Sequence, residues 1–107
     1  MNQIQGLTID TGHGNYGASG IDFLGNNNAA IRNVTIRGSG HTGIQATRGW
    51  SGPALWENVT IEGFDIGIDV TQASYNITME AITLRCQNLF ALRNADNELI
   101  LHNVLID

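Results

Sequence analysis

Apolar and polar residues alternate in a short segment that recurs five times along the chain. GLTID, around Leu7, returns as NVTIR, NVTIE, AITLR and NVLID, with steps of 27, 25, 23 and 22 residues between their central apolar positions. Alternation with a period of two is typical of a half-buried β-strand and not of a helix. Each copy is therefore predicted to be a strand whose two apolar side chains, two residues apart, face a core. These ten inward positions are Leu7, Ile9, Val34, Ile36, Val59, Ile61, Ile82, Leu84, Val104 and Ile106.

Two further apolar tracks share this period. GIDF, GIQA, GIDV and LFAL form one of them, and residues 29–31, 54–56, 77–79 and 99–101 form the other. Three short strands in every 22 to 27 residues predict an all-β fold, a single-stranded right-handed parallel β-helix of about four coils. We expect one domain over residues 1–107. A leucine-rich repeat has a similar period, but no segment shows the 3.6-residue periodicity of the helix that it would require.

Two columns of polar residues support this stacking. The residues that close the five NVTI-like strands alternate in sign and predict a ladder of ion pairs: Asp10, Arg37, Glu62, Arg85 and Asp107. The second column opens these strands and consists of Asn33, Asn58 and Asn103, with Gly6 and Ala81 in the remaining coils. Asn tolerates the left-handed backbone of a tight corner, and stacked Asn amides can bond to each other along the coil axis.

The amino-acid composition excludes several classes of binding partner from our expectations. The 107 residues include ten acidic side chains, five Arg and no Lys, for a net charge of -5. A nucleic-acid-binding protein needs a cluster of basic side chains that displaces the counterions of the phosphates. Five scattered arginines in an acidic chain do not provide one, so we expect no nucleic-acid partner. No apolar run approaches the roughly 20 residues of a membrane span, so no membrane partner is expected either. The single Cys86 offers no disulfide or thiolate metal site, and we expect no metal or cofactor.

With these segments in hand, residues 7–63 resemble the pectate-lyase-like superfamily of right-handed parallel β-helices. The closest likeness is to bacterial proteins labelled pectate-lyase-superfamily or glycoside-hydrolase-family-28-related. The resemblance implies a polysaccharide partner, a binding groove along one parallel sheet and a secreted bacterial protein, although the chain opens with no signal peptide and its localisation stays unknown. Family members are much longer, so the chain is similar to a fragment of about four coils.

The resemblance to active members is partial. Gly12-His13-Gly14 spells a triplet of the polygalacturonases, but the paired Asp and the Arg-Ile-Lys segments that accompany it are absent. No cluster of calcium-binding carboxylates with a neighbouring basic residue supports lyase chemistry. Whether the chain is an enzyme stays open, and a glycoside hydrolase is favoured over a polysaccharide lyase.

Two carboxylates are the candidate catalytic pair. On the GIDF track the outward positions are Asp22, Gln45, Asp69 and then Ala91. Asp22 and Asp69 are two coils apart, or about 9.6 Å at the ordinary strand spacing. That separation is near the upper end of the range of about 6.5 to 9.5 Å for an inverting glycosidase. The alternative is that both are solvated residues on an exposed sheet face.

The loops near this track supply the remaining candidates. His41 and Asp65 are expected to be neighbours on adjacent coils, as a catalytic acid and base or as a structural hydrogen bond. Tyr16 and Trp50 are expected to stack on sugar rings or to pack against their own loops. Gln45 and Arg48 complete the predicted substrate contacts.

Two functions therefore remain open. The first is polysaccharide binding or glycosidic-bond cleavage along the GIDF, GIQA and GIDV sheet. The alternative is a non-catalytic structural or self-assembling module without its own activity. The ends of the coil carry unpaired strand edges, so we expect a homo-oligomer at micromolar concentration, unless residues 1–5 and 97–107 fold across the ends and cap them.

Overall fold

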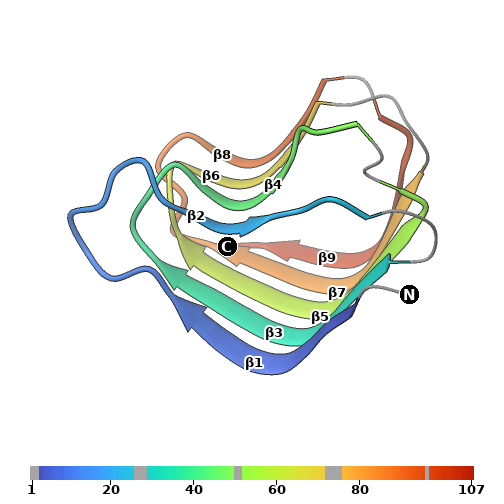
Figure 1. Ribbon diagram of the computed structural model, residues 1–107, viewed down its shortest axis with the longest axis horizontal. Helices are drawn as coiled ribbons and strands as arrows, with labels where there is room; N and C mark the ends of the chain where they lie inside the picture. The colour runs from blue at the N-terminus through green and yellow to red at the C-terminus, as the bar shows by residue number, and fades with distance from the viewer. Residues whose placement is uncertain (1–2, 26–28, 50–51, 72–75, 96) are drawn as a thin grey trace.

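The computed structural model describes residues 3–25, 29–49, 52–71, 76–95 and 97–107 (Figure 1). In these ranges there are nine strands and no helix, and hence none able to cross a membrane. The strands are β1 (Gln3–Asp10), β2 (Ser19–Asp22), β3 (Ala29–Gly38), β4 (Thr42–Ala46), β5 (Ala54–Gly63), β6 (Ile66–Val70), β7 (Ile77–Arg85), β8 (Phe90–Asn94) and β9 (Leu99–Ile106).

The strands form two parallel sheets that face each other across the core. Sheet A has the order β1-β3-β5-β7-β9, and sheet B has the order β2-β4-β6-β8. Each turn of the chain adds one strand to each sheet, which Figure 1 shows as two stacks of successive colours. The predicted all-β parallel β-helix of about four coils is confirmed. The capping alternative is wrong for the described terminal residues, because they continue the coil as β1 and β9.

In sheet A, each track segment such as 29–31 and the NVTI-like segment that follows it join into one bent strand. Asn33, at the bend of β3, has a φ of 53°, and Asn58, at the bend of β5, has a φ of 52°. Gly6, Ala81 and Asn103 also have positive φ, and the pairing register skips all five positions. The Asn58 side-chain amide donates to Oδ1 of Asn33 over 2.9 Å. The left-handed corner is therefore as the sequence predicts. The amide stacking is found between Asn58 and Asn33, whereas the Asn103 amide donates to Oε1 of Glu80 over 2.9 Å.

The core lies between the two sheets in the middle coils. Ile36, Ile61 and Leu84 on sheet A are fully buried, and the Trp56 ring packs edge-on against Phe23 with centroids 5.2 Å apart. The prediction that all ten inward positions are buried is wrong at the ends. Of these ten, only the four in β1 and β9 are not buried, because an outermost strand has a neighbouring coil on one side alone: Leu7, Ile9, Val104 and Ile106.

Three ion pairs of the predicted charge ladder form along the end of sheet A, on either side of the step from Arg37 to Glu62. Arg37 Nε lies 3.1 Å from Asp10 Oδ2 on the preceding coil. Arg85 lies between two acidic residues, with Nη1 3.8 Å from Oε1 of Glu62 and Nε 3.6 Å from Oδ2 of Asp107. All these side chains are substantially exposed, so each pair is screened by solvent and contributes little by itself.

Candidate functional site

Sheet B places the predicted polar column on its outer face. Asp22, Gln45 and Asp69 are register partners on β2, β4 and β6. The fourth member is Arg93 and not Ala91, so the predicted alignment of the last coil is wrong. In β8 the apolar partner of Ile68 is Leu92, two residues beyond the position that the sequence pattern gave it.

The corrected register creates an ion pair whose carboxylate is buried. Arg93 donates from Nε to Oδ1 of Asp69 over 3.0 Å and from Nη2 to Oδ2 over 2.6 Å. The Asp69 side chain is only 4% exposed, whereas that of Arg93 is 43% exposed. These hydrogen bonds, and then the negative charge of Asp69, raise the pKa of Arg93. Asp69 is thus not the solvated carboxylate of the alternative interpretation.

Asp22 and Gln45 are also held by polar neighbours. Arg48, which follows β4, reaches back one coil and places Nη2 2.9 Å from Oδ2 of Asp22. The side-chain oxygen of Gln45 accepts a hydrogen bond from Ser19 over 3.0 Å, and its amide donates to Thr47 over 3.1 Å. Arg48, a predicted substrate contact, therefore lies at the Asp22 end of the column.

The arrangement limits what the two carboxylates can do. An inverting glycosidase needs one carboxyl group as the acid and the other as a base toward water. Both oxygens of Asp69 accept hydrogen bonds from Arg93, so this side chain has no free oxygen directed at a substrate. Asp22 stays half exposed and is open to a ligand.

His41 and Asp65 are neighbours in the coil, as predicted, because the backbone N–H of Asp65 donates to the carbonyl of Gly40 over 3.0 Å. Their described side-chain hydrogen bonds run elsewhere. His41 Nδ1 lies 2.5 Å from the Thr42 hydroxyl, and Asp65 accepts from the Asn88 amide over 2.9 Å. The His41 imidazole and the Asp65 carboxylate therefore lie on adjacent coils, each with a different hydrogen-bond partner among the described residues.

Of the two predicted aromatic contacts, the structure describes one. Tyr16 is exposed in the loop between β1 and β2, which projects from the body of the solenoid (Figure 1). Trp50 lies outside the described residues. His13 of the Gly-His-Gly triplet borders a depression of about 330 Å³, which is also lined by Asp10, Arg37 and Glu62 of the charge ladder.

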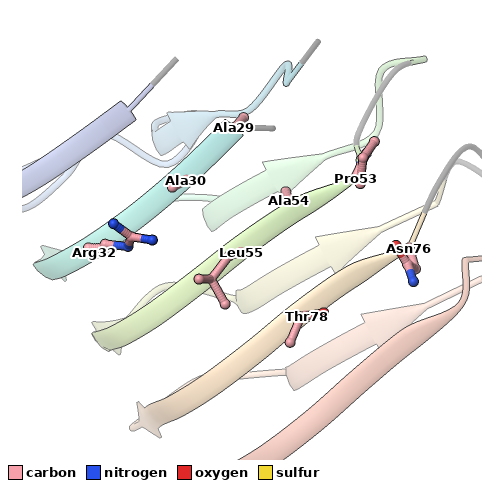
Figure 2. Close-up of a pocket in the computed structure, with 8 residues that line it drawn as sticks. All are labelled: Ala29, Ala30, Arg32, Pro53, Ala54, Leu55, Asn76 and Thr78. Carbon is pink, nitrogen blue, oxygen red and sulfur yellow. The ribbon is translucent and has the colours of Figure 1, made fainter. Parts of the chain in front are cut away.

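A wide depression lies on sheet A. It has a volume of about 390 Å³ and crosses the outer face where β3, β5 and β7 begin (Figure 2). Its lining is mostly small and apolar with one cation: Ala29, Ala30, Arg32, Pro53, Ala54, Leu55, Asn76 and Thr78. Sequence analysis did not predict this depression. The small residues Ala29, Ala30 and Ala54, in the track of residues 29–31 and 54–56, were the available signal. A smaller depression of about 120 Å³ touches the polar column through Asp22.

Arg93 is the site residue that sequence analysis missed. The step from Gln45 to Asp69 is 24 residues, and the same step from Asp69 leads to Arg93. That equal spacing and the opposite charge could have revealed the pair. Within the described ranges, no group of three or more His, Cys, Asp or Glu side chains is arranged to hold a metal ion.

Comparisons with protein-family models, with curated proteins and with solved structures find no match to this chain. The parallel β-solenoid therefore stands on its own strand order and register. Membership of the pectate-lyase-like superfamily stays a proposal.

Proposed function

We propose that this chain is a carbohydrate-binding β-helix module that holds a neutral polysaccharide along the outer face of sheet B without cleaving it. One observation carries the proposal. Asp22, Gln45, Asp69 and Arg93 form a continuous polar column on four successive coils, and Arg48 joins it at the Asp22 end.

The chemistry of the column suits sugar hydroxyl groups. A hydroxyl both donates and accepts, and the column offers a carboxylate acceptor, an amide that does both and guanidinium donors. Its two Asp and two Arg side chains are paired with each other, at 2.9 Å and 2.6 Å, so their formal charges cancel. A face without net charge favours a neutral glycan over a polyuronate.

The ion pairs also hold the column in place before a ligand arrives. Asp69 is buried and held by two hydrogen bonds, so Arg93 is fixed in direction while part of its surface stays in water. A group ordered in advance loses less conformational entropy on binding. Three strand steps make the column about 14 Å long, enough for a few sugar units. The resemblance of residues 7–63 to polysaccharide-acting β-helices supports the same ligand class.

Cleavage is the less favoured activity because of the Asp69 geometry. With both oxygens of Asp69 engaged by Arg93, the pair of Asp22 and Asp69 does not supply an acid and a base together. A ligand can bind across this face while both ion pairs persist.

The test uses the purified chain with a panel of neutral and acidic polysaccharides, in affinity electrophoresis and in an assay for new reducing ends. We expect retention by at least one neutral polysaccharide, weaker retention of Arg48→Ala, and no new reducing ends. Retention by polyuronates alone would contradict the neutral ligand. Reducing ends that are lost in Asp22→Asn would establish hydrolysis instead, and the absence of any retention would overturn the proposal.

A further inference from the structure

We propose that two copies of this 107-residue chain associate head to tail, so that β9 and β8 of one copy pair in parallel with β1 and β2 of the next. This inference concerns the ends of the solenoid and is independent of the polysaccharide proposal. It rests on the register of the strands, on exposed apolar side chains and on the charges at the two ends.

The register already repeats from coil to coil and can be continued by one step. β1 and β9 are the outer strands of sheet A, and each has eight residues. Ile4 pairs with Ile31, and the same column continues to Leu101 in β9. One further step places Ile4 of the next copy on Leu101 and Leu7 on Val104. The bend residues also match, because Gly6 meets Asn103 and both have positive φ.

The two ends expose the side chains that such a joint would bury. Leu101 and Ile106 in β9 and Leu7 in β1 are exposed, whereas their counterparts in the middle coils are buried. Each outer strand also presents a row of backbone N–H and C=O groups to solvent, the usual template for another strand. A second copy satisfies both needs at once, because its first coil has the shape and pleat of the coil that follows β9.

The charges on sheet B favour this polarity. Continuing its register places Asp22 of the next copy beside Arg93, and Ile21 beside Leu92. A joint of two identical ends would instead make the strands antiparallel, unlike all seven strand pairings of the described chain. On sheet A one mismatch remains, because Asp10 would follow Asp107. Each chain also carries a net charge of -5, so two copies repel each other overall. Salt screens this overall repulsion as well as the single Asp22–Arg93 attraction, so association is expected to strengthen as salt is added.

The first test is the mass of the chain by light scattering between about 1 µM and about 1 mM, with and without added salt. We expect the mass to rise above that of the 11.6 kDa monomer with concentration, and to rise further with salt. A head-to-tail contact does not close on itself, so the series continues beyond the dimer. A monomer over the whole range would overturn the proposal.

A matched pair of variants tests the face that is used. Leu101 and Ile100 are neighbours on β9 with 47% and 46% of their surface exposed, but only Leu101 lies in the inward column. Leu101→Arg would bury an unpaired charge in the joint, and we expect at least about 100-fold weaker association. Ile100→Arg places the same charge on the outer face and is expected to associate as the parent does. Equal loss in both variants would contradict an end-to-end joint. Circular dichroism confirms that each variant keeps its strands.

Mixing two blocked variants tests the polarity. Leu7→Arg blocks the first coil, and Leu101→Arg blocks the last. Head-to-tail association predicts that each variant alone is monomeric and that the mixture forms a dimer and nothing larger. Dimers of Leu7→Arg alone would indicate a joint between two last coils, and dimers of Leu101→Arg alone a joint between two first coils. Either result would overturn the proposed polarity.

Discussion

The two outer faces of the solenoid both carry an Asp joined to an Arg on the next coil, yet the two pairs differ in burial. On sheet A, Arg37 donates one hydrogen bond of 3.1 Å to Asp10, and both side chains are exposed. On sheet B, Arg93 makes two hydrogen bonds to Asp69, whose side chain is buried. Register alone creates both pairs. The surroundings decide which of them water screens and which holds a fixed geometry.

The two sheets also approach the core differently. Sheet A turns its corner through a residue with positive φ, and its inward side chains fill the core. Sheet B comes so close at Gly43 that an added Cβ would lie 2.5 Å from Ile61 Cγ2 and 2.7 Å from the Gly67 carbonyl oxygen. Gly20 and Gly67 occupy the equivalent positions of neighbouring coils. The corner of sheet A therefore has room for a side chain, as at Asn33 and Asn58, whereas the glycines of sheet B do not.

The largest expected effect breaks this close approach. Gly43→Ala forces a methyl group against Ile61 and the next strand, and overpacking of this kind costs about 1 to 3 kcal/mol. Urea unfolding measures the loss. Gly49→Ala is the matched control, because nothing lies within 4 Å of its added Cβ and its φ is not positive, and it is expected to leave stability unchanged or raised. Equal effects of the two substitutions would contradict the close packing of sheet B.

The second effect compares the two ion pairs directly. Asp69→Asn keeps an acceptor oxygen but removes the charge that Arg93 contacts, so a charged hydrogen bond of about 1.5 to 3 kcal/mol becomes a neutral one of about 0.5 to 1.5 kcal/mol, a loss of about 1 kcal/mol. We expect the midpoint temperature of thermal unfolding of Asp69→Asn to be several degrees below that of the parent. Asp10→Asn makes the same chemical change in an exposed pair, so its effect is expected to be much smaller. A larger loss in Asp10→Asn would reverse the comparison.

A stabilising change is expected at the corner of sheet A. Ala81 has a φ of 56°, a conformation that costs L-residues about 1 to 2 kcal/mol. Gly removes most of that cost and adds a smaller entropic one, so Ala81→Gly is expected to stabilise the chain by about 0.5 to 1 kcal/mol. Ala30→Gly, at a buried strand position outside the corner, should destabilise it. A loss of stability in Ala81→Gly would show that the corner is not left-handed.

The smallest effect is the acid sensitivity of sheet A. The Asn103 amide and then His102 lower the pKa of Glu80 below its ordinary 4.5, and the Gly12 N–H and then Arg37 lower the pKa of Asp10 below 3.8. A lowered pKa means that the folded state favours the ionised form. The resulting stability is complete above these ordinary values and is lost as pH falls through the lower folded ones.

The urea midpoint measured from pH 6 to pH 2 tests this expectation. Below about pH 4.5 we expect the parent to lose stability faster than Glu80→Gln, which carries no titrating group at this position. Parallel curves for the two proteins would show that the Glu80 contacts do not favour its ionised form.

Sheet A could be predicted almost completely from the sequence. Its five NVTI-like segments alternate clearly, and the Asn and charge columns fix their mutual register. The last strand of sheet B was harder to predict, because Phe90 and its neighbours lack the Gly-Ile-Asp pattern of β2 and β6, and only the 24-residue step from Asp69 to Arg93 indicated its register. There the register depends on the contacts of Leu92 and Arg93 with the coil below, and short-range alternation does not contain that information. Burial of Asp69 follows from the same contacts.

The central claim is that the face of sheet B, and not that of sheet A, binds polysaccharide. Isothermal titration with the neutral polysaccharide that the panel retains best tests it in two variants. Gln45→Ala removes an amide from the middle of the column, and loss of one hydrogen bond of about 0.5 to 1.5 kcal/mol predicts about 2- to 10-fold weaker binding. Thr60→Ala, on the outer face of sheet A, is expected to bind as the parent does. Unchanged affinity in Gln45→Ala together with weakened affinity in Thr60→Ala would contradict the claim.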